Sequence, residues 1–335
     1  MESTTTGTEI TTTTERALTR SKRAERVRET AQRSQSERTL REYKRACQTF
    51  ADWCEREGRV ARDPDPEAAA DTVSEYLRDR ADQGRKRATV EQDLAAIAFA
   101  YQDAGLPSPS RHPGLRKFMR GLRREYAQKG AQAAQVAAVT DTDLRAMLAT
   151  LPDTLMGKRD RAMLLLGWIA ALRRSEIVAL DVADVADDRN GLLVTVRRSK
   201  TDQLGSGMLK AIPYAPTADL CPVRSLRAWL DGAGITSGPV FRAVDRHGNV
   251  KPNRTDGLTV ARVVKRCAEA SGIDARVGGH SLRAGFITTA ALKGCSERAI
   301  ANQTGHKSVP VLRAYVRRAQ AFDDNAATSV VNLGK

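Results

Sequence analysis

Residues 158–180, KRDRAMLLLGWIAALRRSEIVAL, decide the fold class of the second half of this chain. From Ala162 to Leu172 the segment carries no charge, which predicts a buried helix. The character of the sequence changes at Leu172, so we expect the helix to break there. Arg173 ends the run, and a buried guanidinium is costly unless an anion meets it. Glu176, three residues on, could supply that anion in a purely structural ion pair, and an anion from outside the chain is the alternative.

The segment that follows predicts a small antiparallel sheet. Residues 191–216, GLLVTVRRSKTDQLGSGMLKAIPYAP, contain two alternating runs joined by a polar loop, the pattern of a β-hairpin. Lys200 lies at the end of the first strand, where it is either a site residue or one more surface lysine. Helical patterns resume after the hairpin, at residues 220–234, 259–272, 281–294 and 296–305. We therefore expect a mainly α domain with a small antiparallel β-sheet.

The first part of the chain predicts a separate, all-α domain. Four helical patterns begin near Ser36, Ala68, Thr89 and Pro113. They indicate a domain of four to five helices over residues 36–126. Residues 1–35 are rich in Thr, Ser and Arg and predict a disordered or weakly helical lead. The low-complexity Ala/Gln segment 127–139 predicts an interdomain linker, so the second domain covers 140–335.

The charge balance indicates a polyanionic partner. A formal net charge of +15 at pH 7 favours nucleic acid, although a merely soluble basic surface is the alternative. Aromatic residues make up only 4% of the chain, which argues against binding of single strands by base stacking. The fourth helix concentrates basic residues that we expect to contact double-stranded DNA, unless they form a solvated face: Arg116, Lys117, Arg120, Arg123 and Arg124.

Several classes of protein are disfavoured by the composition. The five cysteines are scattered and include no CxxC pair, so neither a disulfide framework nor a zinc site is indicated. The four histidines have no metal-binding spacing, and we predict no metal or other cofactor. No apolar run approaches the roughly 20 residues of a membrane span, and the chain begins without the pattern of a secretion signal. We expect a reduced, cytoplasmic protein with no membrane partner.

The candidate site residues lie near the C-terminal end. His280 and Arg283 are spaced to share one face at a helix N-terminus, where two donors favour a phosphate site. A surface histidine and arginine at this spacing are also common by chance. In residues 305–318, GHKSVPVLRAYVRR, Tyr315 follows His306 by nine positions. On this stretch alone, the favoured interpretation of Tyr315 is the buried aromatic of an amphipathic helix, and a nucleophile is the alternative.

Taken together, the candidates suit a metal-free attack on a phosphodiester. They include two arginines, two histidines, one lysine and one tyrosine, without the carboxylate cluster that metal-assisted nucleases need. A tyrosine hydroxyl could form a phosphotyrosine that conserves the bond energy for religation. Two arginines would offset charge in the transition state, while a lysine or histidine protonates the leaving 5′ oxygen.

The ordered motifs resemble the tyrosine recombinase, or phage-integrase, family. They are ALRRSEI at 171–177, Lys200 on the hairpin, HSLR at 280–283, and GH at 305–306 followed by Tyr315. Each motif alone is weak, but the ordered set is specific and covers the second domain through residue 318. The four-helix first domain resembles the core-binding domain of the family.

The resemblance implies roles for individual residues. Arg173 and Arg283 would bind the phosphate, Lys200 would be the general acid, His280 and His306 the two site histidines, Tyr315 the nucleophile, and Glu176 a support for the Arg173 region. The family fold implies a C-shaped clamp around duplex DNA with an inverted-repeat target site. It also implies four protomers in synapsis, and a monomer or dimer when free.

Two departures from the family pattern bear on this interpretation. Ala284 follows HSLR, where many relatives carry His or Arg. The lead of about 35 residues is too short for the arm-binding domain of some phage integrases, which favours an Xer-like or Cre-like two-domain architecture. Residues 321–335 resemble the tail that docks on a neighbouring subunit in such enzymes, or they pack on their own domain.

Three functions are consistent with these features. The leading one is a site-specific DNA recombinase that forms a 3′-phosphotyrosine and a Holliday junction without metal or ATP. A type IB topoisomerase would use the same chemistry without strand exchange. A non-catalytic DNA-binding protein on this scaffold would be expected to have lost part of the residue set, whereas all six residues are present.

Overall fold

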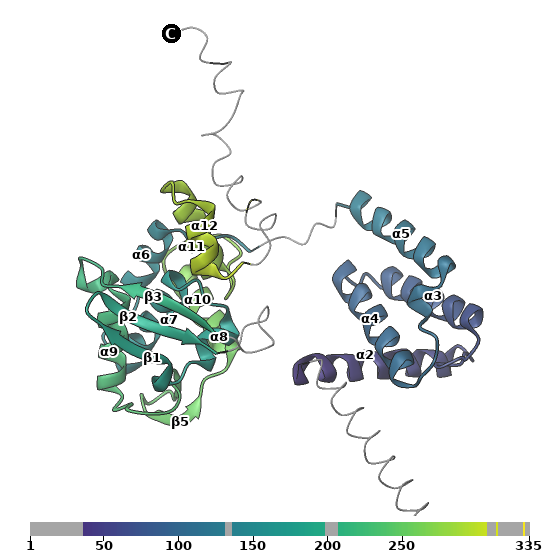
Figure 1. Cartoon of the computed structure of the whole chain (residues 1–335), viewed down its shortest axis with the longest axis horizontal. Coiled ribbons are helices and arrows are strands. Elements are labelled where there is room, and N and C mark those ends of the chain that lie inside the picture. The colour runs from purple at the N-terminus through teal and green to yellow at the C-terminus, as the bar shows by residue number, and fades with distance from the viewer. Residues whose placement is uncertain (1–35, 131–135, 198–206, 307–312, 314–330, 332–335) are drawn as a thin grey trace, which may run out of the picture. The chain divides into compact units, whose positions relative to one another are not determined.

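The computed structural model describes residues 36–130, 136–197, 207–306, 313 and 331. The chain divides into two compact units, with the boundary between Ala133 and Ala134 (Figure 1). The lead 1–35 and nearly all of the tail 321–335 lie outside the described residues. No helix in the described part is long and apolar enough to cross a membrane.

The described part of the first unit contains four α-helices around an aromatic core. Their bounds are α2 Glu37–Arg56, α3 Pro66–Asp82, α4 Arg87–Asp103 and α5 Pro113–Gln128, with a 3₁₀ turn at Pro109–Arg111. Ser36 caps α2 by accepting a hydrogen bond from the Thr39 N–H. The rings of Phe50 and Trp53 pack against Tyr76, with centroids 5.0 and 5.5 Å away. All three rings are buried, so they form the centre of the core of this unit.

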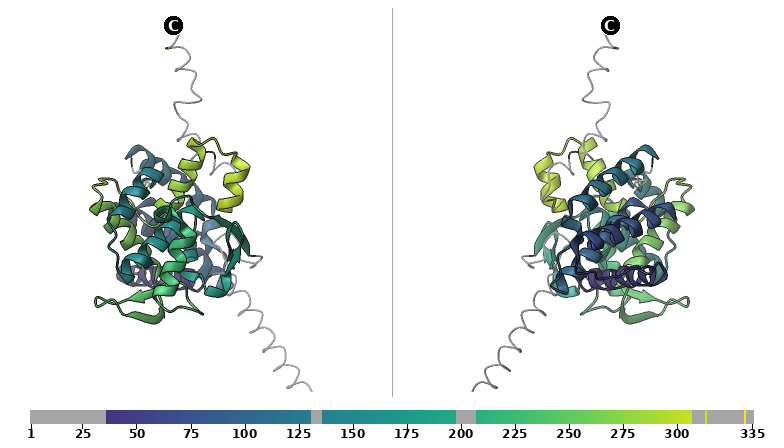
Figure 2. Two further views of the ribbon diagram at one scale, coloured as in Figure 1. Left: turned by 90° about the vertical axis from the view of Figure 1, so that its left-hand side faces the viewer. Right: turned by 90° about the vertical axis from the view of Figure 1, so that its right-hand side faces the viewer.

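The second unit combines seven described helices with two small antiparallel sheets. The helices are α6 Asp141–Ala149, α7 Leu155–Ile169, α8 Arg174–Ala179, α9 Pro222–Gly232, α10 Gly257–Ala270, α11 Ser281–Leu292 and α12 Glu297–Thr304. The strands are β1 Val185–Asp188, β2 Gly191–Val196, β3 Met208–Pro213, β4 Arg242–Val244 and β5 Val250–Arg254. The C-terminal helices α11 and α12 lie side by side in both views of Figure 2, coloured yellow-green.

The predicted hairpin forms the centre of the larger sheet. Its strands run in the order β1-β2-β3, and all pairs are antiparallel. Leu192, Val194 and Val196 alternate into the core of the unit, where they join residues of α7 and α9. The expectation of a mainly α chain with a small antiparallel sheet is confirmed. The strands β1, β4 and β5 were not predicted, because they are short and mostly exposed.

Helix α7 ends where the sequence predicted a break, and an unusual turn ends it. Ala171 has φ +48°, in the left-handed region that favours glycine. Its N–H donates to the Trp168 carbonyl, and the Leu172 N–H donates to the Gly167 carbonyl. This is a Schellman cap with alanine in the glycine position. The Ala171 carbonyl of this turn accepts a hydrogen bond from Arg283 of α11.

The segment before α6 is attached to the second unit. The Ala137 N–H donates to the Arg276 carbonyl, and the Val139 N–H donates to the Ser281 carbonyl. Gly285 permits this crossing, because a Cβ there would lie 1.7 Å from the Val139 oxygen. The linker was predicted over 127–139, whereas α5 continues to Gln128 and residues from Ala137 onward pair with the second unit. An Ala/Gln pattern does not reveal such backbone pairing.

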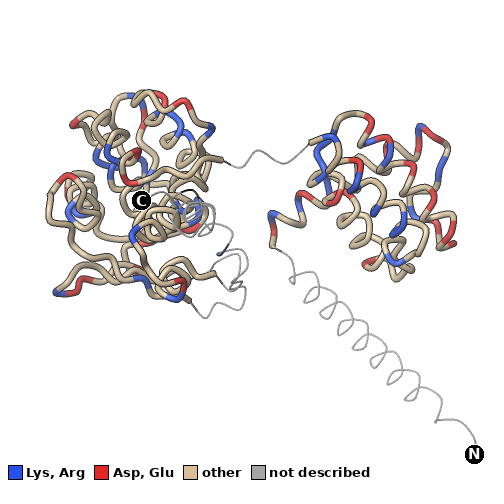
Figure 3. The backbone as a smooth tube through the Cα atoms, turned by 90° about the horizontal axis from the view of Figure 1, so that it is seen from above, with Lys and Arg blue, Asp and Glu red and all other residues tan. Residues whose placement is uncertain are grey.

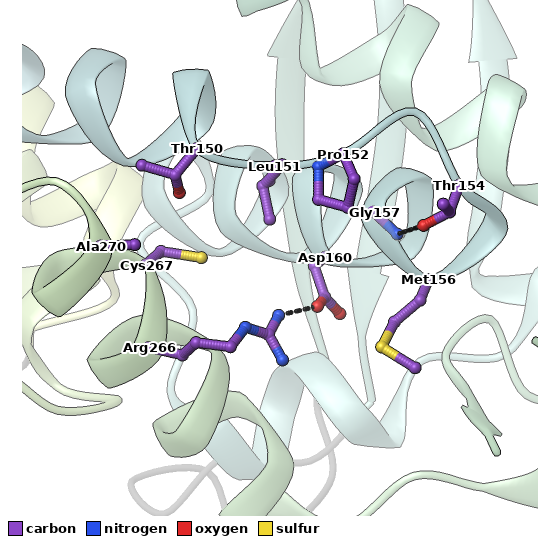
Figure 4. Close-up of a pocket in the computed structure, with 10 residues that line it drawn as sticks. All are labelled: Thr150, Leu151, Pro152, Thr154, Met156, Gly157, Asp160, Arg266, Cys267 and Ala270. Carbon is purple, nitrogen blue, oxygen red and sulfur yellow. Dashed lines mark hydrogen bonds and ion pairs between the residues drawn. The ribbon is translucent and has the colours of Figure 1, made fainter. Parts of the chain in front are cut away.

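A buried carboxylate of α7 is expected to contribute strongly to stability. Asp160 is fully buried and pairs with Arg159, at 2.8 Å, and with Arg266 of α10 (Figure 4). Asp160→Ala should lower the free energy of unfolding by about 3–5 kcal/mol, because Arg159 then stays buried without its anion. Calorimetry of the full chain measures this, with Asp187→Ala as the control.

Asp187 makes a matched control because its ion pair with Arg227 is solvent-exposed. Its removal should cost about 0–1 kcal/mol. If the two variants unfolded at the same temperature, the buried pairing of Asp160 would not have the assigned effect.

Candidate active site

The second unit brings four of the six predicted catalytic residues to the ends of three helices. Arg173 is the N-cap of α8, His280 is the N-cap of α11, Arg283 lies in the first turn of α11, and His306 follows α12. Lys200 and Tyr315 lie outside the described residues. Thus helix ends that are far apart in sequence converge, and their convergence makes a site for an anion.

Glu176 holds Arg173 in place. One oxygen of its buried carboxylate accepts the Arg173 side chain at 2.6 Å, and the other accepts the Arg173 backbone N–H at 2.9 Å. The structural ion pair considered from the sequence is therefore present. The Arg173 side chain nevertheless remains 22% exposed, so part of its guanidinium is accessible to a second anion.

Arg283 is almost completely buried and connects two chain segments. Its Nη1 donates to the Ala171 carbonyl at 2.7 Å, and its Nη2 lies 3.4 Å from His306 Nε2. The left-handed turn at Ala171 aims that carbonyl at the guanidinium. Arg283 is thus fixed between the end of α7 and the residue that follows α12, which gives it a preorganised direction.

The hydrogen bonds around His306 assign its tautomer. The Thr304 hydroxyl donates to the Ile300 carbonyl at 2.7 Å, so it must accept from His306 Nδ1, also at 2.7 Å. The Nε2 atom is then unprotonated and faces the Arg283 guanidinium, which can only donate. His306 is therefore a neutral imidazole with an acceptor nitrogen at the site.

Electrostatics favours the same neutral form. Desolvation, followed by the charges of Arg283 and Arg173, lowers the pKa of His306 to about 4. The pKa of His280 is also lowered, first by desolvation and then by Arg283, Arg173 and Arg174. A site with this concentration of positive charge is arranged to receive an anion.

The low pKa of His306 predicts an acid-dependent loss of stability. An unfolded histidine has a pKa near 6.5, so between about pH 6.5 and 4 the unfolded chain binds more protons than the folded one. Stability therefore falls as pH falls through this window, by on the order of 2 kcal/mol for this group.

Unfolding free energies at pH 7 and pH 4.5 test the assignment. The wild type should lose about 1–2 kcal/mol more than His306→Gln across this interval, since both chains share the titration of their carboxylates. Equal losses in the two proteins would contradict the assigned neutral histidine.

Lys210 was not among the predicted site residues. It is 2% exposed on β3, and its Nζ donates to the Gln303 carbonyl in the last turn of α12. Burial, then Arg283, lowers its pKa to about 8. The alternation of Met208, Lys210 and Ile212 is the signal that could have found it, because a lysine on the core face of a strand is anomalous.

The turn after α12 positions His306. Gly305 has φ +70°, and its N–H donates to the Ala301 carbonyl at 2.7 Å. A Cβ at Gly305 would lie 2.8 Å from the sulfur of Met208, so this turn packs closely on β3. Farther along the chain, Arg313 pairs with Glu297 at the start of α12.

The predicted DNA-contact residues of the first unit share one face of α5. Arg116, Lys117, Arg120, Arg123 and Arg124 are all exposed. At about 100° per residue they cover an arc of roughly 120°, opposite the buried residues Leu115, Met119 and Leu122. Arg123 also pairs with Glu91. Acidic positions are interspersed with basic ones in both units (Figure 3). The face of α5 that carries these five basic residues is therefore a local concentration of positive charge on a surface of mixed charge.

Two further polar features of the described residues bear on the location of the reaction site. Among the described residues, no group of three or more His, Cys, Asp or Glu side chains could hold a metal ion. The pocket in Figure 4 lies between the end of α6, the start of α7 and α10. Its two charged lining residues, Asp160 and Arg266, are paired with each other. We therefore place the candidate chemistry at the cluster formed by Arg173, His280, Arg283 and His306.

Comparison with known proteins covers most of the chain. Residues 138–321 match the model of the phage integrase family. The integrase/recombinase xerD homolog of Selenomonas ruminantium is 34% identical over 309 residues, which is 90% of this chain and 87% of that protein. The recombinase cre of Escherichia phage P1 is 26% identical over 299 residues, 84% of each chain.

Solved structures show a similar fold at low sequence identity. The Tn1549 transposon integrase in complex with transposon right end DNA has a TM-score of 0.52 and 15% identity, covering 87% of this chain and 99% of that one. The XerH site-specific recombinase bound to palindromic difH substrate, in a post-cleavage complex, has a TM-score of 0.51 and 15% identity, covering 80% and 72%.

Proposed function

This chain belongs to the phage integrase family of tyrosine recombinases, and we propose that it cleaves and rejoins duplex DNA through a 3′-phosphotyrosine intermediate. We further propose that two recombining duplexes exchange strands through a Holliday junction. The observation that carries this proposal is the convergence of Arg173, Arg283, His280 and His306 on one positively charged site.

The two arginines are the proposed ligands of the cleaved phosphate. Arg173 is braced by Glu176 and keeps an accessible part, while Arg283 is fixed by the Ala171 carbonyl. Donors held in this way offset the charge that develops on the non-bridging oxygens of the five-coordinate transition state. Because they are already oriented, little reorganisation is needed when the phosphate reacts.

Tyr315 is the proposed nucleophile, on the strength of the motif order. The second unit contains one other tyrosine, Tyr214, and its ring stacks with Arg224 and Arg227, each 5.8 Å from the ring centroid. In the proposed step, the Tyr315 oxygen bonds to phosphorus as the bond to the 5′ oxygen breaks. A site histidine takes the tyrosine proton, and Lys200 gives a proton to the departing 5′ oxygen.

The proposed partner is double-stranded DNA with an inverted-repeat site. The net charge of +15 and the basic face of α5 support it, and both solved relatives described above were determined with DNA. We propose that the protein is a monomer or dimer when free and a tetramer when two sites are joined. Each protomer would close on the duplex as a clamp formed by its two units.

Strand exchange between two selected duplexes tests this function. A randomised duplex library bound by the protein yields the preferred site, and two labelled copies of that site are then incubated with the protein. We expect four-way junctions and exchanged products on native gels, without added metal or ATP. Relaxation of any supercoiled plasmid, without junctions and without sequence preference, would overturn recombination in favour of topoisomerase activity.

A further inference from the structure

Arg174 lies next to Arg173, and its side chain passes over two glycines of neighbouring segments. A Cβ added at Gly279 would lie 2.1 Å from its Cδ and 2.2 Å from its Cγ. A Cβ added at Gly257, the first residue of α10, would lie 3.8 Å from its Cβ. Arg174 can extend across the loop that leads to His280 because Gly279 has no side chain.

Arg174 has no carboxylate partner within the part of the chain that the structure describes, whereas several other arginines of this unit have one. Arg173 pairs with Glu176, and Arg197 and Arg254 both pair with Asp181. Arg174 is half-buried, and its methylene groups cover Gly279. Its guanidinium is therefore held at this position without a neutralising carboxylate among the described residues, and an anion that arrived there would gain a charge-assisted hydrogen bond.

The position also places Arg174 at the proposed reaction site. Its methylene groups lie on Gly279, the residue directly before His280, and its charge acts on His280. Arg173, the residue directly before it, is a proposed ligand of the cleaved phosphate. Consecutive phosphates of a DNA strand are close enough for adjacent residues of one turn to bind neighbouring ones.

We propose that Arg174 binds a phosphate of the DNA backbone beside the one that is cleaved, and that Gly279 serves to hold its side chain in the required direction. Arg174 would act by binding and aligning the strand. The inference rests on the proposed function for the identity of the anion. Its geometric part, the dependence of Arg174 on Gly279, stands on the contacts alone.

A double-mutant cycle tests both parts. Arg174→Ala, Gly279→Ala and the double variant are made in the full chain carrying Tyr315→Phe, so that only binding is measured. Gly279 has no positive φ, so alanine is compatible with its backbone and acts by displacing Arg174. Affinity for the library-selected duplex is measured by fluorescence anisotropy over a range of salt concentrations.

We expect each single variant to lose about tenfold in affinity at low salt and to reduce the slope of log K against log salt by about 1. The double variant should be no weaker than the weaker single variant, since both changes remove the same contact. Arg174→Lys should recover part of the lost affinity, because it keeps a positive charge but not the planar guanidinium.

The contradicting results are distinct from one another. Unchanged affinity and salt slope in Arg174→Ala would overturn the phosphate contact. If that variant also unfolded at a lower temperature, the role of Arg174 would be purely structural. Additive losses in the double variant would overturn the role of Gly279. Absence of strand exchange by the wild type would contradict the proposed function, yet the binding cycle would still decide whether Arg174 contacts DNA.

Discussion

Tyr315→Phe is expected to abolish covalent attachment of the protein to DNA while leaving DNA affinity within about threefold of wild type. Phenylalanine keeps the aromatic ring but lacks the oxygen that we propose attacks phosphorus. The measurement uses a duplex of the selected site with a nick beside the cleavage position, so that the short 5′-hydroxyl fragment diffuses away and the adduct accumulates. Denaturing gels then separate protein–DNA adducts from free protein.

Tyr214→Phe is the matched control for this variant. Tyr214 is the other tyrosine of the second unit, and its ring packs against arginine side chains. The control should form the adduct at the wild-type rate. If Tyr315→Phe still formed the adduct, or if Tyr214→Phe lost it, the nucleophile would have been assigned to the wrong residue.

Arg283→Lys should slow cleavage by roughly 10²–10³-fold with a change in DNA affinity of less than about tenfold. Lysine keeps the positive charge, but one ammonium cannot hold both the Ala171 carbonyl and the position beside His306. Loss of one preorganised donor to a developing oxyanion has an effect of this size. Single-turnover adduct formation on the nicked duplex measures the rate.

Arg266→Lys provides the comparison for Arg283→Lys. Arg266 lies on α10 of the same unit, its side chain is 52% exposed, and lysine can keep its pairing with Asp160. This variant should cleave at close to the wild-type rate. A similar loss in both variants would indicate a general effect of arginine replacement on the unit, and would contradict the specific role of Arg283.

The elements that the sequence predicted well are those with long, regular patterns. The uncharged run before Arg173 became α7 and ended at the expected place, and the alternating residues of 191–216 became β2 and β3. The strands β1, β4 and β5 have only three to five residues each, and their burial depends on neighbours that are distant in sequence. Periodicity in so short a segment carries little information.

The residues of the candidate site also differ in how far the sequence predicted them. The order of the motifs located Arg173, His280, Arg283 and His306, and the structure brings these residues together. Lys210 was not predicted, although its place on the core face of β3 is a local signal; its contact with Gln303, 93 residues further along the chain, could not be read from the sequence. The orientation of Arg174 was equally inaccessible, since it depends on the space at Gly279, and a sequence does not indicate which side chain covers a given glycine.

We propose above all that Tyr315 becomes covalently linked to the 3′ phosphate of the cleaved strand. Mass spectrometry of the adduct from wild-type protein and the nicked duplex, after digestion with protease and nuclease, identifies the linked residue. We expect a nucleotide attached through phosphate to Tyr315, in the peptide that contains Ala314 and Val316. A nucleotide attached to any other residue, or to the 5′ end of the strand, would contradict it.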